Sequence, residues 1–221
     1  MSDLNQFVYD RVKASTELAN FRRLLTGRKE LREKEDVLPF FKQHRQLTAA
    51  IATLYSYVSR PNRLRFEHRV AGHFRCDLLI GQQADDAVSR FILVEFEDAR
   101  PHSIFGRGTS SRRHPEWGRR LEHGFSQIID WFWWNDENGG GQEFRDTYGP
   151  GAVEFHGLLV TGRTADLDDA GRRRLHWRSS RLKVGSQELR ILTYDDLHEA
   201  LANELESAAL IAKLQAGKPD A

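Results

Sequence analysis

The chain has 221 residues, of which 39% are hydrophobic and 29% are charged, and its formal net charge is only +1. This composition suffices for a packed core, and the near-neutral charge says little about partners. The single cysteine excludes an internal disulfide, and no apolar run approaches the roughly 20 residues that a membrane-spanning helix needs. We therefore expect a soluble, cytoplasmic protein without a membrane segment.

The N-terminal part of the chain is predicted to be helical. Apolar residues recur at helical spacing over residues 3–26. A second helix is expected near Pro39 and a third over residues 48–58. We assign residues 1–60 to an N-terminal helical region and residues 61–221 to the domain that carries the chemistry.

Three strands follow a break at Pro61. Residues 64–70 alternate between apolar and polar side chains, as a half-exposed strand does. Residues 74–80 and 90–97 are two further apolar runs, and a polar turn joins them. Short turns between consecutive strands predict an antiparallel meander.

An arginine-rich loop follows the third strand. Residues 99–114 are rich in Gly and Ser and carry several arginines but no acid. Most loops of this kind are simply solvated, yet a loop beside a carboxylate cluster is well placed to touch phosphates. As contacts to nucleic acid we predict Arg107, Arg112 and Arg113 from this loop, and Arg119 after it.

The remaining elements alternate between helices and strands. In chain order we predict a helix over residues 115–134, a polar loop over 135–151, a strand over 153–161, a basic helix over 166–177, a strand over 188–193 and a final helix from 194 to about 214. This order favours an α/β sandwich with a mixed sheet. Trp131, Trp133 and Trp134 are suited to stacking on bases, to core packing or to an oligomer interface.

Three carboxylates lie within the second and third predicted strands. Glu95 and Glu97 share a face because side chains alternate along a strand. If the two strands pair as a hairpin, Asp77 lies beside Glu95. Buried acids are rare unless something pairs with them, and a divalent cation is a suitable partner for such a cluster.

Structural alternatives for these residues stay open at this point. Asp77 can simply cap or pair at the end of its strand. Glu97 can pair with Arg100 or Arg107. Gln127, which sits among apolar residues of a predicted helix, can be an ordinary satisfied core amide.

The order of these motifs resembles the PD-(D/E)xK nuclease superfamily and, more narrowly, the Shedu family of bacterial anti-phage nucleases. The resemblance covers about two-thirds of the chain. It rests on Glu67, on Asp77 with the DLLI strand, on VEFE at 94–97, on Trp117, on FSQIIDW at 125–131, on GLLVTGR at 157–163 and on ILTYDDL at 191–197. It implies a restriction-endonuclease-like core, α-β-β-β-α-β, with a mixed central sheet flanked by helices.

The resemblance also implies a function, an endonuclease that cleaves DNA with Mg²⁺, for which Mn²⁺ can substitute, in phage defence. Asp77 and Glu95 would be the metal ligands, aided by the carbonyl of Phe96, and Gln127 would face the active site. Glu97 stands where the superfamily usually has lysine, and an ionised Glu97 can accept a proton or bind a second cation. Because Shedu relatives assemble as oligomers, the resemblance also implies a homo-oligomer.

Two alternatives to this function remain. One is a relative that binds nucleic acid, DNA or RNA, without cleaving it, which the departure at Glu97 suggests. The other is an oligomeric interaction module whose interface uses the tryptophans and the last helix.

Overall fold

The computed structural model describes residues 4–70, 74–84, 87–107 and 114–216, so Arg112 and Arg113 lie outside the described residues. The helices are α1 (Arg11–Gly27), α2 (Leu38–Gln43), α3 (Arg45–Ala50), α4 (Arg119–Asn138), α5 (Gln142–Tyr148), α6 (Asp169–Arg181) and α7 (Tyr194–Ala216). A π-helical turn, η1 (Glu33–Val37), and two 3₁₀ turns, η2 (Ile51–Leu54) and η3 (Thr164–Asp166), join them. The strands are β1 (Arg63–Val70), β2 (Phe74–Gln82), β3 (Ser89–Phe96), β4 (Val153–Val160), β5 (Lys183–Val184) and β6 (Gln187–Leu192).

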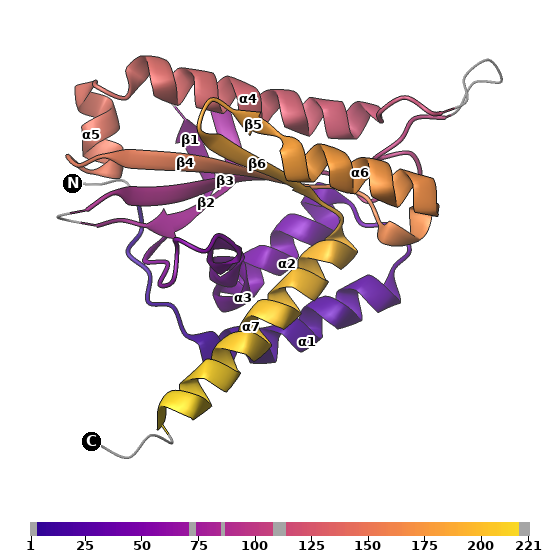
Figure 1. Cartoon of the computed structure of the whole chain (residues 1–221), viewed down its shortest axis with the longest axis horizontal. Coiled ribbons are helices and arrows are strands. Elements are labelled where there is room, and N and C mark those ends of the chain that lie inside the picture. The colour runs from indigo at the N-terminus through magenta and orange to yellow at the C-terminus, as the bar shows by residue number, and fades with distance from the viewer. Residues whose placement is uncertain (1–3, 71–73, 85–86, 108–113, 217–221) are drawn as a thin grey trace.

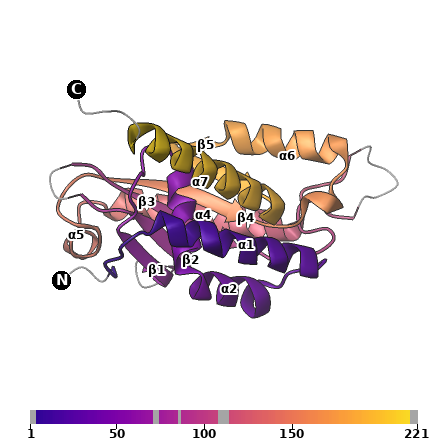
Figure 2. The ribbon, with the colours of Figure 1, turned by 90° about the horizontal axis from the view of Figure 1, so that it is seen from below.

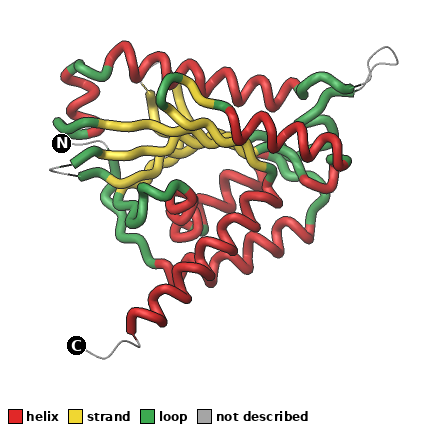
Figure 3. Tube along the Cα trace, in the orientation of Figure 1, coloured by secondary structure: helices red, strands yellow, loops and turns green. Residues whose placement is uncertain are grey.

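The strands form one six-stranded mixed sheet in the order β1-β2-β3-β4-β6-β5. Figure 3 draws the strands in yellow between layers of red helices. The meander β1-β2-β3 is antiparallel, whereas β3 and β4, and β4 and β6, pair in parallel. Parallel neighbours need a crossover, and α4 with α5, and then α6, supply it. The predicted fold class, a mixed sheet flanked by helices, is confirmed.

Helices cover both faces of the sheet. Figure 1 shows α4 running along one face, while α1, α2, α3 and α7 lie on the other, and Figure 2 shows this second layer from below. The alternation along β3 explains the division. Ile92, Val94 and Phe96 pack with the N-terminal helices and α7, whereas Phe91 and Leu93 pack with α4. Both faces of the central strand are therefore buried.

The prediction of a helix over residues 3–26 is wrong in its first part, because α1 begins only at Arg11. Asp10 caps it by accepting a hydrogen bond from a backbone N–H of the first turn. Before that cap, the chain runs extended, and Gln6 forms a bridge with Arg63 at the start of β1. The apolar spacing at the start of the chain fits a helix, but the backbone of residues 5–7 pairs with the sheet edge instead.

The helix predicted over residues 115–134 is also shifted, since α4 begins at Arg119 and ends at Asn138. The residues before it form a narrow hairpin with the loop after β3, because Gly118 N donates to Ile104 O at 2.7 Å. A side chain at Gly118 would meet the Ser103 carbonyl oxygen at 2.4 Å, so only glycine allows this approach.

The polar loop predicted over residues 135–151 is wrong. Helix α4 continues through its first residues, and α5 occupies most of the remainder. Phe144 and Tyr148, one turn apart on α5, are both buried against Phe91 and Phe155 of the sheet. This apolar pair is the signal for α5, and the surrounding glycines and polar residues obscured it.

Smaller differences concern element ends. The helix predicted over residues 48–58 is replaced by the shorter α3 and the 3₁₀ turn η2. The helix predicted over 166–177 begins after its cap, Asp168, and β5 was not predicted. Among the described residues, no helix combines the length and the apolar character required to cross a bilayer.

A candidate carboxylate site

Asp77 and Glu95 lie side by side on neighbouring strands. The β2–β3 register pairs Leu78 with Val94, so the next position sets Asp77 opposite Glu95. One oxygen of Asp77, Oδ2, accepts a hydrogen bond from the Phe96 backbone N–H at 2.9 Å. The hairpin expected from the sequence therefore brings these two carboxylates together at the end of β3.

Glu95 and Glu97 both point toward α4, as the alternation predicted. A Cβ placed on Gly124 of that helix would lie 3.5 Å from the Cγ of Glu95 and 3.2 Å from the Cγ of Glu97. It would also meet a methyl of Leu159 at only 2.5 Å. The absence of a side chain at Gly124 lets α4 approach the two carboxylates closely.

Side chains from the first half of α4 hold both glutamates. Gln127 Nε2 donates to Glu95 Oε1 at 2.5 Å, so its amide does face the carboxylates. Glu97 lies 2.7 Å from His123 Nδ1 through one oxygen and 3.1 Å from Arg120 Nη1 through the other. The ion-pairing alternative for Glu97 thus holds, but with Arg120.

Burial and mutual repulsion disfavour ionisation of the paired acids. Burial, reinforced by the charges of Glu33 and Glu97, raises the pKa of Asp77 to about 7, although the Phe96 N–H opposes the shift. Burial and then the charges of Asp77 and Glu97 raise the pKa of Glu95 well above its ordinary value. A site that holds several acids at such a cost needs positive charge for its full ionisation.

Sequence reasoning missed four residues of this site. Asp98 is buried and pairs with Arg120 at 2.9 Å and with Arg100 at 3.1 Å. Glu33, in η1, donates its backbone N–H to Asp98 Oδ1, and burial followed by the Glu97 charge raises the pKa of its carboxyl. Arg120 and His123, both on α4, are the other two. Their spacing from Gln127, seven and four residues, was the available signal.

Backbone strain lies next to the site. Glu67 has a φ of 49°, which is uncommon for a residue with a side chain. The pairs Phe66–Leu78 and His68–Cys76 flank it, so Glu67 falls opposite Asp77. Its carboxylate bonds to Lys42 Nζ at 2.8 Å, which ties α2 to β1 here. This ion pair helps to hold the strained residue in place.

The donor set suits a hard divalent cation. Among the described residues, no group of three or more His, Cys, Asp or Glu side chains forms a ready-made metal site. However, Glu95 Oε2 is buried and has no hydrogen-bond partner within the described part of the chain. An orphaned carboxylate oxygen beside a second carboxylate, Asp77, fits an ion such as Mg²⁺, which needs few protein ligands and keeps several waters.

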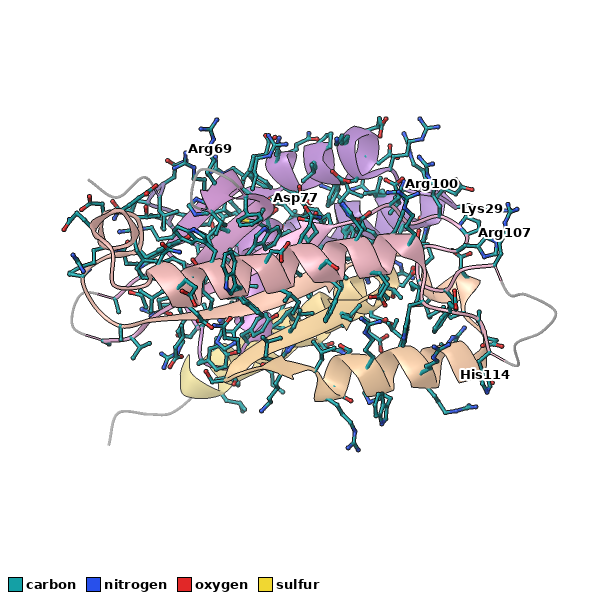
Figure 4. The ribbon with its side chains drawn as sticks, turned by 90° about the horizontal axis from the view of Figure 1, so that it is seen from above. Lys29, Arg69, Asp77, Arg100, Arg107 and His114 are labelled. Carbon is teal, nitrogen blue, oxygen red and sulfur yellow. The ribbon has the colours of Figure 1, made fainter. Side chains whose placement is uncertain are left out.

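Basic residues gather at one end of the molecule. Figure 4 shows Lys29, Arg100 and Arg107 together near the first turn of α4, while Asp77, on β2, is seen beside the middle of that helix. Arg107 and Arg119, predicted to contact nucleic acid, are both exposed. A cavity of about 530 Å³ lies at the same end, between the loop after β3 and the segment after β4. Its lining includes Arg100, His102 and Arg163.

The tryptophans of α4 differ from one another. Trp131 is buried and packs in the core between α4 and the sheet, as the packing alternative predicted. Trp133 is 58% exposed, whereas Trp134 is partly buried against the same core.

Comparison with known proteins returned one family. The model described as the C-terminal part of Shedu protein SduA matches residues 31–198, which is more than half of the chain. The matched range contains the whole sheet, α4 and the carboxylates described above. No curated protein matches the chain.

Proposed function

The chain belongs to the Shedu family, whose domain points to anti-phage defence, and from this premise we propose that it is a divalent-cation-dependent endonuclease that cleaves DNA. A single observation carries the proposal. The buried Glu95 and the half-buried Asp77 lie together at the end of β3 with raised pKa values, and one oxygen of Glu95 has no partner among the described residues. Membership of the PD-(D/E)xK superfamily is part of the same proposal.

Asp77 and Glu95 would hold Mg²⁺, with Mn²⁺ as a substitute. When bound there, such an ion would supply positive charge to the scissile phosphate and would lower the pKa of a bound water. The chain orients the ligands. Gln127 engages Glu95 Oε1 and thereby leaves Oε2 for the ion, and the Phe96 N–H fixes Asp77. These contacts hold the carboxylates before any ion binds, which limits reorganisation.

DNA would approach the basic end of the molecule. Arg107 and Arg119 are exposed there, and Arg112 and Arg113 belong to the same proposal from the sequence. Cations beside a carboxylate site attract the phosphate backbone and offset the repulsion that the acids exert on it. RNA offers the same phosphates and is the alternative substrate.

Nicking of supercoiled plasmid in Mg²⁺ or Mn²⁺ tests the proposal. We expect wild type to nick DNA, a chelator to stop it, and Glu95→Gln to lose cleavage while retaining DNA binding. Asp130→Asn, an exposed acid further along α4, is the matched control. Cleavage that survives Glu95→Gln, or a wild type inert on plasmid, linear and single-stranded DNA, would contradict the proposal. A parallel assay with RNA identifies the substrate.

A second candidate, binding without cleavage, is favoured by Glu97. This residue occupies the position at which the superfamily usually has lysine, and Arg120 and His123 engage both of its oxygens. DNA binding that is indifferent to a chelator and to Glu95→Gln, in a wild type that cleaves nothing, would select this candidate.

We also propose that the chain forms a homo-oligomer. Leu210, Ile211 and Leu214 on the last turns of α7, and Val8 and Val12 at the start of the chain, are all more than half exposed. Apolar surface of this extent suits contact with a second copy. Light scattering should show an assembly that Ile211→Glu disrupts, and a monomer at micromolar concentration would contradict it.

A further inference from the structure

Glu97 is poorly placed to act directly in chemistry. Its side chain is only 4% exposed, and its two oxygens face His123 and Arg120. Arg120 is itself shared with Asp98, which adds a second ion pair to the arrangement. A carboxylate held in this way orients its neighbours better than it accepts a proton from a substrate.

His123, in contrast to Glu97, has an exposed side chain. Its Nδ1 lies 2.7 Å from Glu97 Oε1, while the side chain as a whole is 66% exposed. With a proton on Nδ1 donated to the carboxylate, the lone pair of the neutral ring remains on Nε2. An imidazole oriented by a buried carboxylate is the arrangement that general bases use elsewhere.

The position of His123 on α4 brings it to the candidate metal ligands. Gln127, four residues later and on the same face of the helix, bonds to Glu95. Gln127 Nε2 also lies 3.3 Å from His123 Nδ1, so the two side chains are in contact. Gly124, next to His123, provides the close approach of this turn to the carboxylates.

We propose that His123, oriented by Glu97, is the general base for phosphodiester cleavage. It would take over the role of the lysine that the superfamily usually has at the position of Glu97. This inference rests on the proposed endonuclease activity. The Nε2 atom takes one proton from the attacking water as the water oxygen forms a bond to phosphorus. The bond from phosphorus to the leaving oxygen breaks, and that oxygen takes a proton from solvent. His123 then returns its proton to solvent.

Arg120 has a supporting part in this arrangement. Its contacts to Glu97 and Asp98 fix the carboxylate that orients the ring. Arg120 and Glu97 are thus positioning residues, and only His123 contacts the reacting water. This assignment predicts that His123 variants affect the chemical step more than they affect cation binding.

Two His123 variants test the proposal in the full-length protein. His123→Asn retains an amide that can donate to Glu97 but has no base, and His123→Ala leaves space for added imidazole. We expect both to cleave plasmid about 100-fold or more slowly, with unchanged melting temperature and unchanged Mn²⁺ affinity. Imidazole should restore part of the cleavage by His123→Ala only. His176→Ala, an exposed histidine on α6, is the matched control and should cleave like wild type.

The outcomes separate this proposal from the proposed function. Near-normal cleavage by His123→Asn would overturn the role of His123 and leave the endonuclease intact. Slow cleavage without imidazole rescue, or with weaker Mn²⁺ binding, would assign His123 a structural role and also overturn the proposal. A wild type that cleaves no nucleic acid would overturn both.

Discussion

The two faces of the sheet are covered by helices with different duties. On the face toward α1–α3 and α7, a large cluster of apolar side chains dominates the packing, as in the ring stack of Phe41 on Phe96 at 4.7 Å. On the α4 face, the second half of the helix buries Ile128 and Phe132, but its first half meets carboxylates. One face thus supplies stability, while half of the other face has a polar site in place of apolar packing.

The largest expected effect comes from the apolar face. Phe21 of α1 is fully buried and packs against Phe40 and Phe41, with ring centroids 5.4 Å apart in each pair. Phe21→Ala should lower the free energy of unfolding by about 3–5 kcal/mol, measured by urea denaturation. If the apolar face contributes only to stability, the folded fraction of Phe21→Ala should bind Mn²⁺ with the affinity of wild type. Weaker Mn²⁺ binding at full folding would show that the apolar face also shapes the site.

Helix α4 approaches the carboxylates closely at Gly124. Alanine is normally better than glycine inside a helix by about 1 kcal/mol, but a Cβ at Gly124 would collide with Leu159 and crowd Glu97. Gly124→Ala should therefore destabilise the protein by about 1–3 kcal/mol and abolish cleavage. Gly27→Ala, at the end of α1, is the control, because a Cβ there would have none of the described atoms within 4 Å. A stabilised, active Gly124→Ala would mean that the helix need not lie so close.

The polar half of the α4 face lowers the stability of the folded protein above neutral pH. Because burial and neighbouring charges raise the pKa of Asp77 from 3.8 to about 7, the folded state binds a proton more tightly than the unfolded state does. Stability is therefore lost as pH rises through that window, and the cost is complete above it. Asp77→Asn should stabilise the chelator-treated protein at pH 8 by about 1–3 kcal/mol.

That advantage should shrink as the pH falls from 8 to 5, because wild type then regains its proton. Chemical denaturation at several pH values measures it, with Asp130→Asn as the control. A constant difference across this range would show that Asp77 does not titrate in the way its surroundings require. Loss of cleavage together with higher stability would be the sign of a residue kept for function.

The carboxylates could be predicted from the sequence because local rules fix their positions. Alternation puts Glu95 and Glu97 on one face, and a short turn sets the hairpin register that brings Asp77 across. The sheet and its flanking helices followed from the same patterns. The domain boundary near residue 60 stays a prediction, although α1–α3 share one apolar cluster with the sheet and α7.

The partners of the carboxylates could not be predicted in the same way. Glu33 reaches the site only because Leu31 pairs with Ala99, a contact between distant segments. In the sequence, Arg120 and His123 resemble ordinary polar residues of an amphipathic helix. Only the structure reveals how closely that helix approaches the carboxylates at Gly124. Helix α5 depends on packing against the sheet rather than on local propensity. Contacts across long sequence separations thus account for most of what was missed.

The smallest effect is expected from single arginines at the surface, where the two sides of the molecule can also be compared. Arg107 is exposed in the loop after β3, whereas Arg22 is exposed on α1, which covers the face of the sheet opposite α4. Each phosphate contact contributes a near-unit slope to the dependence of log affinity on log salt concentration. Arg107→Ala should therefore weaken DNA binding several-fold at low salt and reduce that slope by about 1, while Arg22→Ala should change neither. Equal effects of the two variants in a salt titration would mean that DNA does not distinguish the two sides. The cations near α4 would then not guide phosphates to Asp77 and Glu95.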